Sequence, residues 1–361
     1  MSHAWYKTYQ KLEAFIKNQP EVQIKENFVS INEKVRPAFY KLFNNVRTSF
    51  LAEKFSTWLD EAEFLSTKYM KVEDDLIERL RLKHVLMPLE LRRSLSDPIK
   101  QIIREMFDPL FELLQKKIEM EEFEEKALER IGVVSRGLYQ KGYIKWFIVS
   151  LIKKLDPEKI YEIPIFQPSS KEIIKHRKDT LQTIPLSEET DILGFEVVRR
   201  DIVLVPDFIV FSKLLGKYVG FRTEVGKAVW EASHHSDKRE WFSIGSMMQD
   251  YGIVNMSPDL LLYVADNQED ISLVADSKKF CRPDMMIEFL DQVEENGADQ
   301  VGDFNRIKSF NDVLKPVKGT CIISKHPVSE NMKEGLSDNI IPIHFGFNNV
   351  KWDTVLGLLK Q

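Results

Sequence analysis

Glycine is absent from the N-terminal part of this 361-residue chain, and the first one is Gly132. Apolar residues in that part recur at spacings of three and four, as in Phe39, Leu42, Phe43, Val46 and Phe50. This spacing places them on one face of a helix, in a segment that lacks helix-weakening glycines. We therefore predict that residues 1–156 form a domain that is helical almost throughout.

Prolines mark the breaks between these predicted helices, at Pro20, Pro88 and Pro98. Ser96 or Asp97 is suited to cap a helix that has Pro98 at its first position. Residues 108–130 are rich in Leu, Glu and Lys. That composition predicts one long amphipathic helix with an acidic outer face.

The composition changes at Pro157, and residues 157–193 contain four prolines, which predicts a partly ordered connector. After residue 193, β-branched residues and glycines occur together. The strands predicted from this pattern include residues 208–211, 218–221, 319–324 and 339–344. The helices predicted between and after them are residues 225–234, 238–251, 283–295, 299–314 and 352–359.

The predicted fold class is therefore α+β overall. An all-helical N-terminal half is followed by an α/β core, residues 194–361, in which helices flank a mixed sheet. At this length the chain suits two domains, each with enough residues to bury a core.

Two further strand-like runs, Leu260–Val264 and Ile271–Ala275, surround a polar turn. A tight turn at the centre would put Asp259 opposite Asp276, with Cβ atoms roughly 4.5–5.5 Å apart. Lys278 would lie on the same face, because side chains alternate along a strand. Facing carboxylates repel each other unless a cation lies between them, and an oxygen-bound divalent metal ion is the usual one. The pattern predicts a metal site; the alternative is a solvated hairpin with charged ends.

The pattern Pro258-Asp259, sixteen further residues and then Asp276-Ser277-Lys278 resembles the signature of the PD-(D/E)XK nuclease superfamily, also called restriction-endonuclease-like. The resemblance implies a restriction-endonuclease-like core over about residues 220–345 and does not extend to the helical half. It implies that Asp259 and Asp276 hold Mg²⁺, for which Mn²⁺ is expected to substitute. It also implies that Lys278 assists the water that attacks a phosphodiester.

The resemblance implies further residues around the acid pair. In the superfamily another acid often lies just ahead of the hairpin, and here it is Glu224, with Glu231 as the alternative. Gln300, on the predicted crossover helix, begins a segment similar to the Gln-x-x-x-Tyr feature of some branches, with Phe304 in place of tyrosine. We expect Glu224 to help hold the metal and Gln300 to contact Lys278 or a phosphate. An exposed glutamine and a core phenylalanine are the alternative interpretation.

A rival hairpin begins at Asp207, which also follows a proline and precedes Glu224 at the same separation as the first acid pair. The lysines decide between the two hairpins. Lys227 is three residues after Glu224 and would point to the opposite face of a strand, whereas Lys278 is in phase with Asp276. We therefore prefer the later hairpin.

Phosphate binding needs a local positive face rather than a positive total charge. The chain carries a net charge of −5, but residues 79–104 contain seven basic residues and two acids. Arg92 and Arg93 lie in this segment and are the predicted contacts to a nucleic-acid backbone. A solvated helix face is the alternative interpretation, and residues 119–129 are conversely acidic.

The two cysteines, Cys281 and Cys321, have no spacing typical of a zinc site or a disulfide framework. Such low cysteine usage fits a reducing compartment. The most apolar run, residues 146–152, is far too short to span a bilayer. We expect a cytoplasmic protein that has no membrane partner.

These observations together predict a metal-dependent endonuclease that hydrolyses phosphodiester bonds in DNA, in a setting such as restriction or defence. The competing hypothesis is a nuclease fold without activity, used as a scaffold, whose helical half docks a partner protein. The acidic segment and the negative net charge favour that alternative, because DNA-binding proteins are more often basic.

Overall fold

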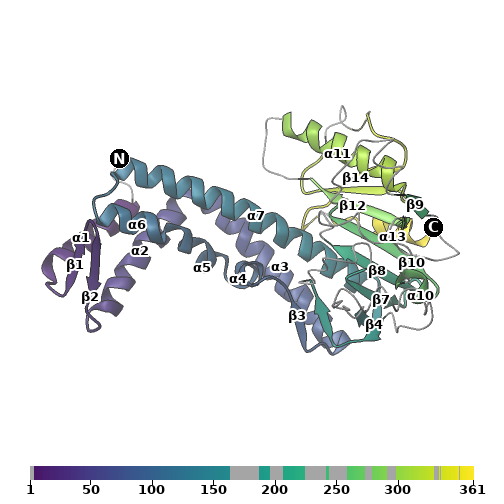
Figure 1. Cartoon of the computed structure of the whole chain (residues 1–361), viewed down its shortest axis with the longest axis horizontal. Helices are drawn as coiled ribbons and strands as arrows, with labels where there is room; N and C mark the ends of the chain where they lie inside the picture. The colour runs from purple at the N-terminus through teal and green to yellow at the C-terminus, as the bar shows by residue number, and fades with distance from the viewer. Residues whose placement is uncertain are drawn as a thin grey trace, which may run out of the picture. The chain divides into compact units, whose positions relative to one another are not determined.

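The structure is a computed structural model (Figure 1), and it describes residues 4–162, 187–195, 206–223, 241–243, 258–272, 279–290, 298–328, 333, 335–348 and 350–361. The chain divides into two compact units. The helical unit contains Met1–Lys71 and Pro88–Trp146, and the sheet unit contains Val72–Met87 and Phe147–Gln361. An N-terminal helical region followed by a large mixed sheet confirms the coarse α+β prediction.

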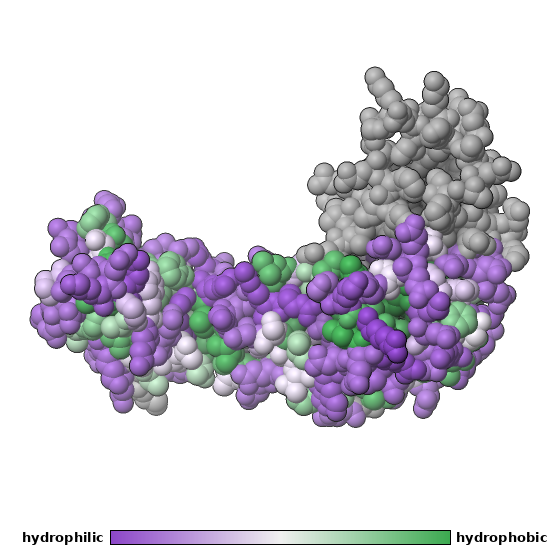
Figure 2. Space-filling view, turned by 90° about the horizontal axis from the view of Figure 1, so that it is seen from below, coloured by the Kyte–Doolittle hydropathy of each residue, from purple (hydrophilic) through white to green (hydrophobic). Residues whose placement is uncertain are grey.

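The helices of the N-terminal region are α1 (Ala4–Asn18), α2 (Arg36–Lys54), α3 (Ser56–Leu80), α4 (Leu89–Ser96), α5 (Pro98–Ile102), α6 (Phe107–Leu114) and α7 (Met120–Lys154). A 3₁₀ turn, Ile103–Met106, joins α5 to α6. The predicted cap is confirmed, since the Asp97 carboxylate accepts a hydrogen bond from the Lys100 backbone N–H (2.9 Å) and Pro98 opens α5. Hydrophilic residues cover much of the visible face of the helical unit (Figure 2).

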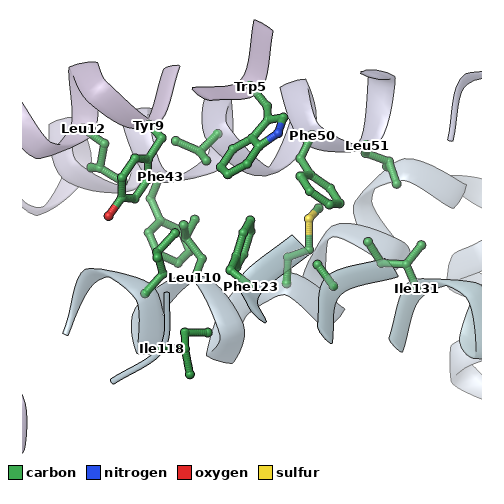
Figure 3. Packing of buried hydrophobic residues seen from close by; sticks show 14 of the residues in the cluster. Trp5, Tyr9, Leu12, Phe43, Phe50, Leu51, Leu110, Ile118, Phe123 and Ile131 are labelled. Atoms are coloured by element: carbon green, nitrogen blue, oxygen red, sulfur yellow. The ribbon is translucent and has the colours of Figure 1, made fainter. Parts of the chain in front are cut away.

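Aromatic and aliphatic side chains pack together in the core of the helical unit (Figure 3). The ring of Trp5, on α1, lies 5.4 Å from that of Phe50 on α2 and 5.3 Å from that of Phe123 on α7. The indole N–H of Trp5 donates a hydrogen bond to the Glu124 carboxylate (3.0 Å). Large rings bury much apolar surface, and here they join the first helix to helices far along the chain.

Two predictions for the helical half are wrong. Residues 108–130 do not form one helix, because Lys116 adopts a left-handed backbone conformation (φ 59°) between α6 and α7. A β-hairpin, β1 (Val22–Lys25) with β2 (Phe28–Ile31), was not predicted. Its signal was present in the sequence: alternating apolar and polar residues flank a two-residue turn that contains Asn27.

The main sheet of the sheet unit has eight strands among the described residues. Their order is β14 (Ile340–His344), β13 (Thr320–Ser324), β12 (Met285–Phe289), β10 (Leu260–Ala265), β8 (Lys217–Thr223), β7 (Phe208–Ser212), β4 (Pro157–Glu162) and β5 (Glu188–Glu189). The pairs from β12 to β14 are parallel, and those from β5 to β12 are antiparallel. The sheet is mixed, as the sequence predicted.

Two small sheets complete the strand pairing that the structure describes. β11 (Lys279–Cys281) pairs with β9 (Trp241–Ser243), and β3 (His84–Leu86) pairs with β6 (Ile192–Gly194). β9 is a strand inside the segment 238–251, for which a helix was predicted. The range predicted as a connector, 157–193, contributes β4 and β5 to the main sheet, and residues 163–186 lie outside the described residues.

Helices cover both faces of the main sheet. On one face, α11 (Ala298–Leu314) packs residues such as Phe304 and Ile307 against Met286 and Ile322 of the strands. On the other face, the Phe147 ring lies 5.1 Å from the Phe289 ring. This second face is covered by the last residues of α7 and by α13 (Trp352–Lys360). The Trp352 ring of α13 lies 5.0 Å from the Phe147 ring of α7.

Most of the predicted strands of this unit that lie in the described part of the chain are confirmed: β7, β8, β10, β13 and β14, together with helices α11 and α13. The helix predicted over residues 283–295 is wrong where it is described, because Met285–Phe289 is the central strand β12. Every residue of β12 is buried. A strand buried on both faces has a continuous apolar sequence, which can also match helical spacing.

Candidate acidic site at one edge of the sheet

Several strands of the main sheet reach a common edge. The parallel strands β12, β13 and β14 end there, at Phe289, Ser324 and His344, and β10 begins there at Leu260. In open sheets with parallel strands, ligands bind outside the carboxyl ends of the strands. This edge is therefore the place to look for functional side chains.

Two carboxylates meet at this edge. Leu260 of β10 pairs with Ile287 of β12, so Asp259 lies opposite Glu288 at the end of the ladder. The Asp259 backbone N–H donates a hydrogen bond to Glu288 Oε1 (2.9 Å). In return, the Phe289 backbone N–H donates to Asp259 Oδ2 (2.8 Å). The side chains thus continue the strand pairing where the backbone ladder stops.

Glu288 is the more deeply buried of the two acids, with a side chain only 1% exposed. Burial raises the pKa of Glu288 well above its usual value, and the charge of Asp259 raises it further. Arg306 acts in the opposite direction. The second oxygen, Glu288 Oε2, is buried and has no hydrogen-bond partner among the described residues. A buried acceptor in that state favours a cation or a proton.

Among the described residues, Arg306 on α11 is a cation beside this acid pair. Its Nη2 lies 3.9 Å from Glu288 Oε2 and 3.4 Å from Asp303 Oδ1, one helical turn earlier. Its guanidinium carbon is 5.9 Å from the centroid of the Phe310 ring. The arginine side chain is 45% exposed, so it contacts solvent while its guanidinium lies near the buried Glu288 carboxylate.

The hairpin predicted from the sequence is wrong. β10 pairs with β8 along one side and with β12 along the other, and Glu269–Ser272 is the short helix α10 rather than a strand. The residue found opposite Asp259 is therefore Glu288. Asp276 and Lys278 lie outside the described residues.

The rival hairpin does exist as β7 and β8, but its register differs from the predicted one by two residues. Phe208 pairs with Phe221, which puts Asp207 opposite Arg222. Arg222 and Asp207 form a buried ion pair. Asp207 Oδ2 also accepts hydrogen bonds from the backbone N–H (2.7 Å) and the hydroxyl (2.9 Å) of Thr223.

A third Pro-Asp pair, Pro283-Asp284, precedes β12, and all three pairs have a similar place in the sheet. Each aspartate precedes a strand and accepts a hydrogen bond from a backbone N–H of an adjacent strand: Asp207 from Thr223, Asp259 from Phe289 and Asp284 from Val264. In this chain the Pro-Asp dipeptide therefore precedes a strand of the main sheet in all three places, and its aspartate has a structural role in each.

The other predicted site residues are far less completely described. Glu224, Glu231 and the rival Lys227 lie outside the described residues. Gln300 is in the first turn of α11, but its side chain is not described. Arg92 and Arg93 are on α4 of the helical unit, where Arg93 is exposed.

Sequence reasoning missed Glu288 and Arg306. Glu288 is a single charge in the apolar run 285–290. A buried, isolated acid in such a run is a signal for function, but the apolar spacing of this run predicts a helix and hides its burial in a sheet. Arg306 had no signal of its own, because only the packing of α11 on the sheet brings it near the acids.

Two carboxylates suit a hard cation such as Mg²⁺, which binds through one or two carboxylates and keeps several waters. Among the described residues, no group of three or more His, Cys, Asp or Glu side chains is placed to hold a metal ion. Comparison with known proteins found no matching family model, no matching curated protein and no matching solved structure. None of the described helices combines the length and apolar character needed to cross a membrane.

Proposed function

We propose that the sheet unit is a Mg²⁺-dependent nuclease domain that hydrolyses phosphodiester bonds in DNA, with Asp259 and Glu288 as its carboxylate pair. One observation carries the proposal: a fully buried carboxylate, Glu288, faces a second acid at the carboxyl edge of the sheet, and its Oε2 has no hydrogen-bond partner among the described residues. Burying two facing acids is unfavourable unless a ligand or proton compensates them.

Each described residue would have a defined task. Asp259 and Glu288 would hold the metal ion, and their backbone hydrogen bonds keep both side chains oriented. When bound, Mg²⁺ polarises the scissile phosphate and lowers the pKa of a bound water. Mn²⁺ would substitute for it, because both ions accept carboxylate and water oxygens.

Three residues outside the described part of the chain remain predicted members of the site. Glu224 follows Thr223, the last described residue of β8, and is the predicted third carboxylate. Asp276 and Lys278 keep their predicted roles as metal ligand and as the lysine that assists the attacking water. Arg92, Arg93 and Gln300 are proposed contacts to the DNA backbone.

A second candidate function is a non-catalytic scaffold with a nuclease-like fold. The observation that favours it is the shared role of the three Pro-Asp pairs, because Asp259 accepts a backbone hydrogen bond as Asp207 and Asp284 do. On this view the acid pair shares a proton and the helical unit recruits another protein.

Isothermal titration with Mn²⁺, together with a plasmid-nicking assay, separates the two candidates. We expect one Mn²⁺ to bind the full chain, and both binding and nicking to be lost in Glu288→Gln and Asp259→Asn. The matched control is Asp284→Asn, whose amide oxygen can still accept the Val264 N–H, and it should keep Mn²⁺ binding. If the unchanged chain neither binds Mn²⁺ nor nicks DNA, the scaffold is the correct function.

A further inference from the structure

Arg306 lies near a buried acid and is also accessible to solvent. It approaches a buried acid at one end, yet the arginine side chain is 45% exposed. We infer that Arg306 binds a backbone phosphate of double-stranded DNA and thereby positions the strand beside Asp259 and Glu288. This inference rests on the proposed function of the same edge.

The contacts of Arg306 leave hydrogen-bonding capacity for such a ligand. The distances to Glu288 Oε2 (3.9 Å) and Asp303 Oδ1 (3.4 Å) are longer than the 2.7–2.9 Å typical of strong charge-assisted hydrogen bonds. A guanidinium has five N–H donors in a planar fork. The exposed part of that fork can bind two phosphate oxygens at once.

The side chain is also held in place for this task. Asp303 is one turn earlier on the same helix, and the Phe310 ring lies 5.9 Å below the guanidinium carbon. An arginine that packs on an aromatic ring loses less freedom when it binds an anion. Arg306 is thus oriented by its own helix, independently of any ligand.

The acidic side chains at this edge of the sheet repel DNA, so a cation is needed there for DNA to bind. Asp259, Glu288 and Asp303 are acids that repel a phosphate backbone, whereas Arg306 extends from among them into solvent. A planar guanidinium suits phosphate geometry better than an ammonium does. A single arginine at the acidic edge would allow one phosphate to lie next to the carboxylate pair.

A polar cavity in the described part of the sheet unit is a weaker candidate. Its volume is about 450 Å³, and it is lined by Arg282, Asn311, Asp312, Lys315, Ser337 and Asn339. It lies where β13 and β14 begin, which is the edge opposite the acid pair. Asn311 there is bound to Thr320 (2.9 Å) and Asn339 (3.2 Å), so its polar groups serve the fold.

The test is fluorescence anisotropy of a fluorescein-labelled 20-base-pair duplex, titrated in Ca²⁺ at several salt concentrations. Arg306→Gln should weaken binding about tenfold and lower the slope of log K against log salt by about 1. Arg306→Lys keeps the charge and should keep the slope. Lys308→Gln is the matched control, since it removes one positive charge from the same helix, and it should change neither quantity.

Each outcome decides between the inference and the function on which it rests. An Arg306→Gln variant with unchanged affinity and slope, or a full chain that binds no duplex, overturns the role of Arg306. Mn²⁺ titration of the same proteins reports separately on the acid pair, and Arg306→Gln should still bind Mn²⁺. If the duplex binds through Arg306 but Mn²⁺ never binds, the DNA contact stands and the nuclease function fails.

Discussion

The starts of β7 and β10 carry the same dipeptide in two opposite electrostatic environments. At β7, Asp207 lies opposite Arg222 and forms a buried ion pair with it. At β10, Asp259 lies opposite another acid, Glu288. Both aspartates accept a backbone N–H from the neighbouring strand, whereas their cross-strand partners carry opposite charges.

This difference separates a structural acid from a functional candidate. The Asp207 carboxylate is fully compensated by a cation and by Thr223, which gives it nothing to offer a ligand. At the Asp259–Glu288 pair the cross-strand partner is a second acid, and Arg306 lies 3.9 Å from Glu288 Oε2. Two acids placed opposite each other are retained more readily where a ligand or proton completes the site.

The largest expected effect is at the compensated pair. Asp207→Ala should destabilise the protein by about 3–5 kcal/mol, because it leaves the charge of Arg222 buried without its partner. Denaturant unfolding measures this free energy. The control is Asp266→Ala, whose side chain is 77% exposed and should cost less than about 0.5 kcal/mol. Equal effects of the two substitutions would mean that Asp207 is not structural.

The second effect concerns pH and the Asp259–Glu288 pair. Because the pKa of Glu288 is raised above its usual 4.5, the folded state keeps its proton to higher pH than the unfolded state does. The contribution of Glu288 to the free energy of unfolding is therefore fully present below pH 4.5 and is lost as the pH rises through the raised pKa. Each pH unit in that interval costs about 1.4 kcal/mol.

Glu288→Gln tests this sign in EDTA, so that no divalent ion contributes. We expect the variant to be more stable than the unchanged chain at pH 8 and to lose that advantage near pH 4. Unfolding free energies at several pH values measure the difference, and groups that titrate alike in both proteins cancel. A variant that is less stable at every pH would show that Glu288 is held as a well-compensated charge.

A smaller effect is expected at the hydrogen bond between Thr223 and Asp207. The Thr223 hydroxyl donates to Asp207 Oδ2 at 2.9 Å inside the sheet. Thr223→Val removes that donor at nearly constant volume and should cost about 1 kcal/mol. Thr223→Ser, which keeps the hydroxyl, serves as the comparison in the same unfolding experiment. An unchanged unfolding free energy in Thr223→Val would show that this hydrogen bond does not contribute to stability.

The smallest effect is expected at the solvent side of the acid pair. Asp303→Asn removes a half-exposed ion pair with Arg306 and should change the unfolding free energy by less than about 0.5 kcal/mol. The thermal midpoint in metal-free buffer provides the measurement. A loss of several kcal/mol would make Arg306 part of a structural network and would remove the contrast with the β7 ion pair.

Much of the fold could be predicted because its signals are local. The β7–β8 hairpin, the strands β13 and β14 and the helix α11 all follow from alternation, turns and helical spacing. β12 could not be assigned in this way, because Met286, Phe289 and Leu290 match helical spacing while the strand is buried on both faces. Local patterns do not report burial on two sides.

The candidate site could be predicted only in part for the same reason. Asp259 was recognisable because a proline precedes it and a strand follows it. Its partner depends on which strand lies beside β10, and the nearest apolar run in the sequence, 271–275, is not that strand. Pairing between distant segments is fixed by the whole sheet, so neither Glu288 nor Arg306 could be assigned to the site from spacing alone.

The strand order of the main sheet has a consequence for how the molecule is made. From β7 to β14, each next strand of the main sheet is added beside the preceding one, and β7 itself pairs with β4. A chain emerging from the ribosome can therefore extend the sheet at one growing edge, without opening strands that have already paired. Asp259 arrives 29 residues before Glu288. Until β12 is synthesised, β10 is the growing edge, so we expect the two acids to meet only in the last third of synthesis.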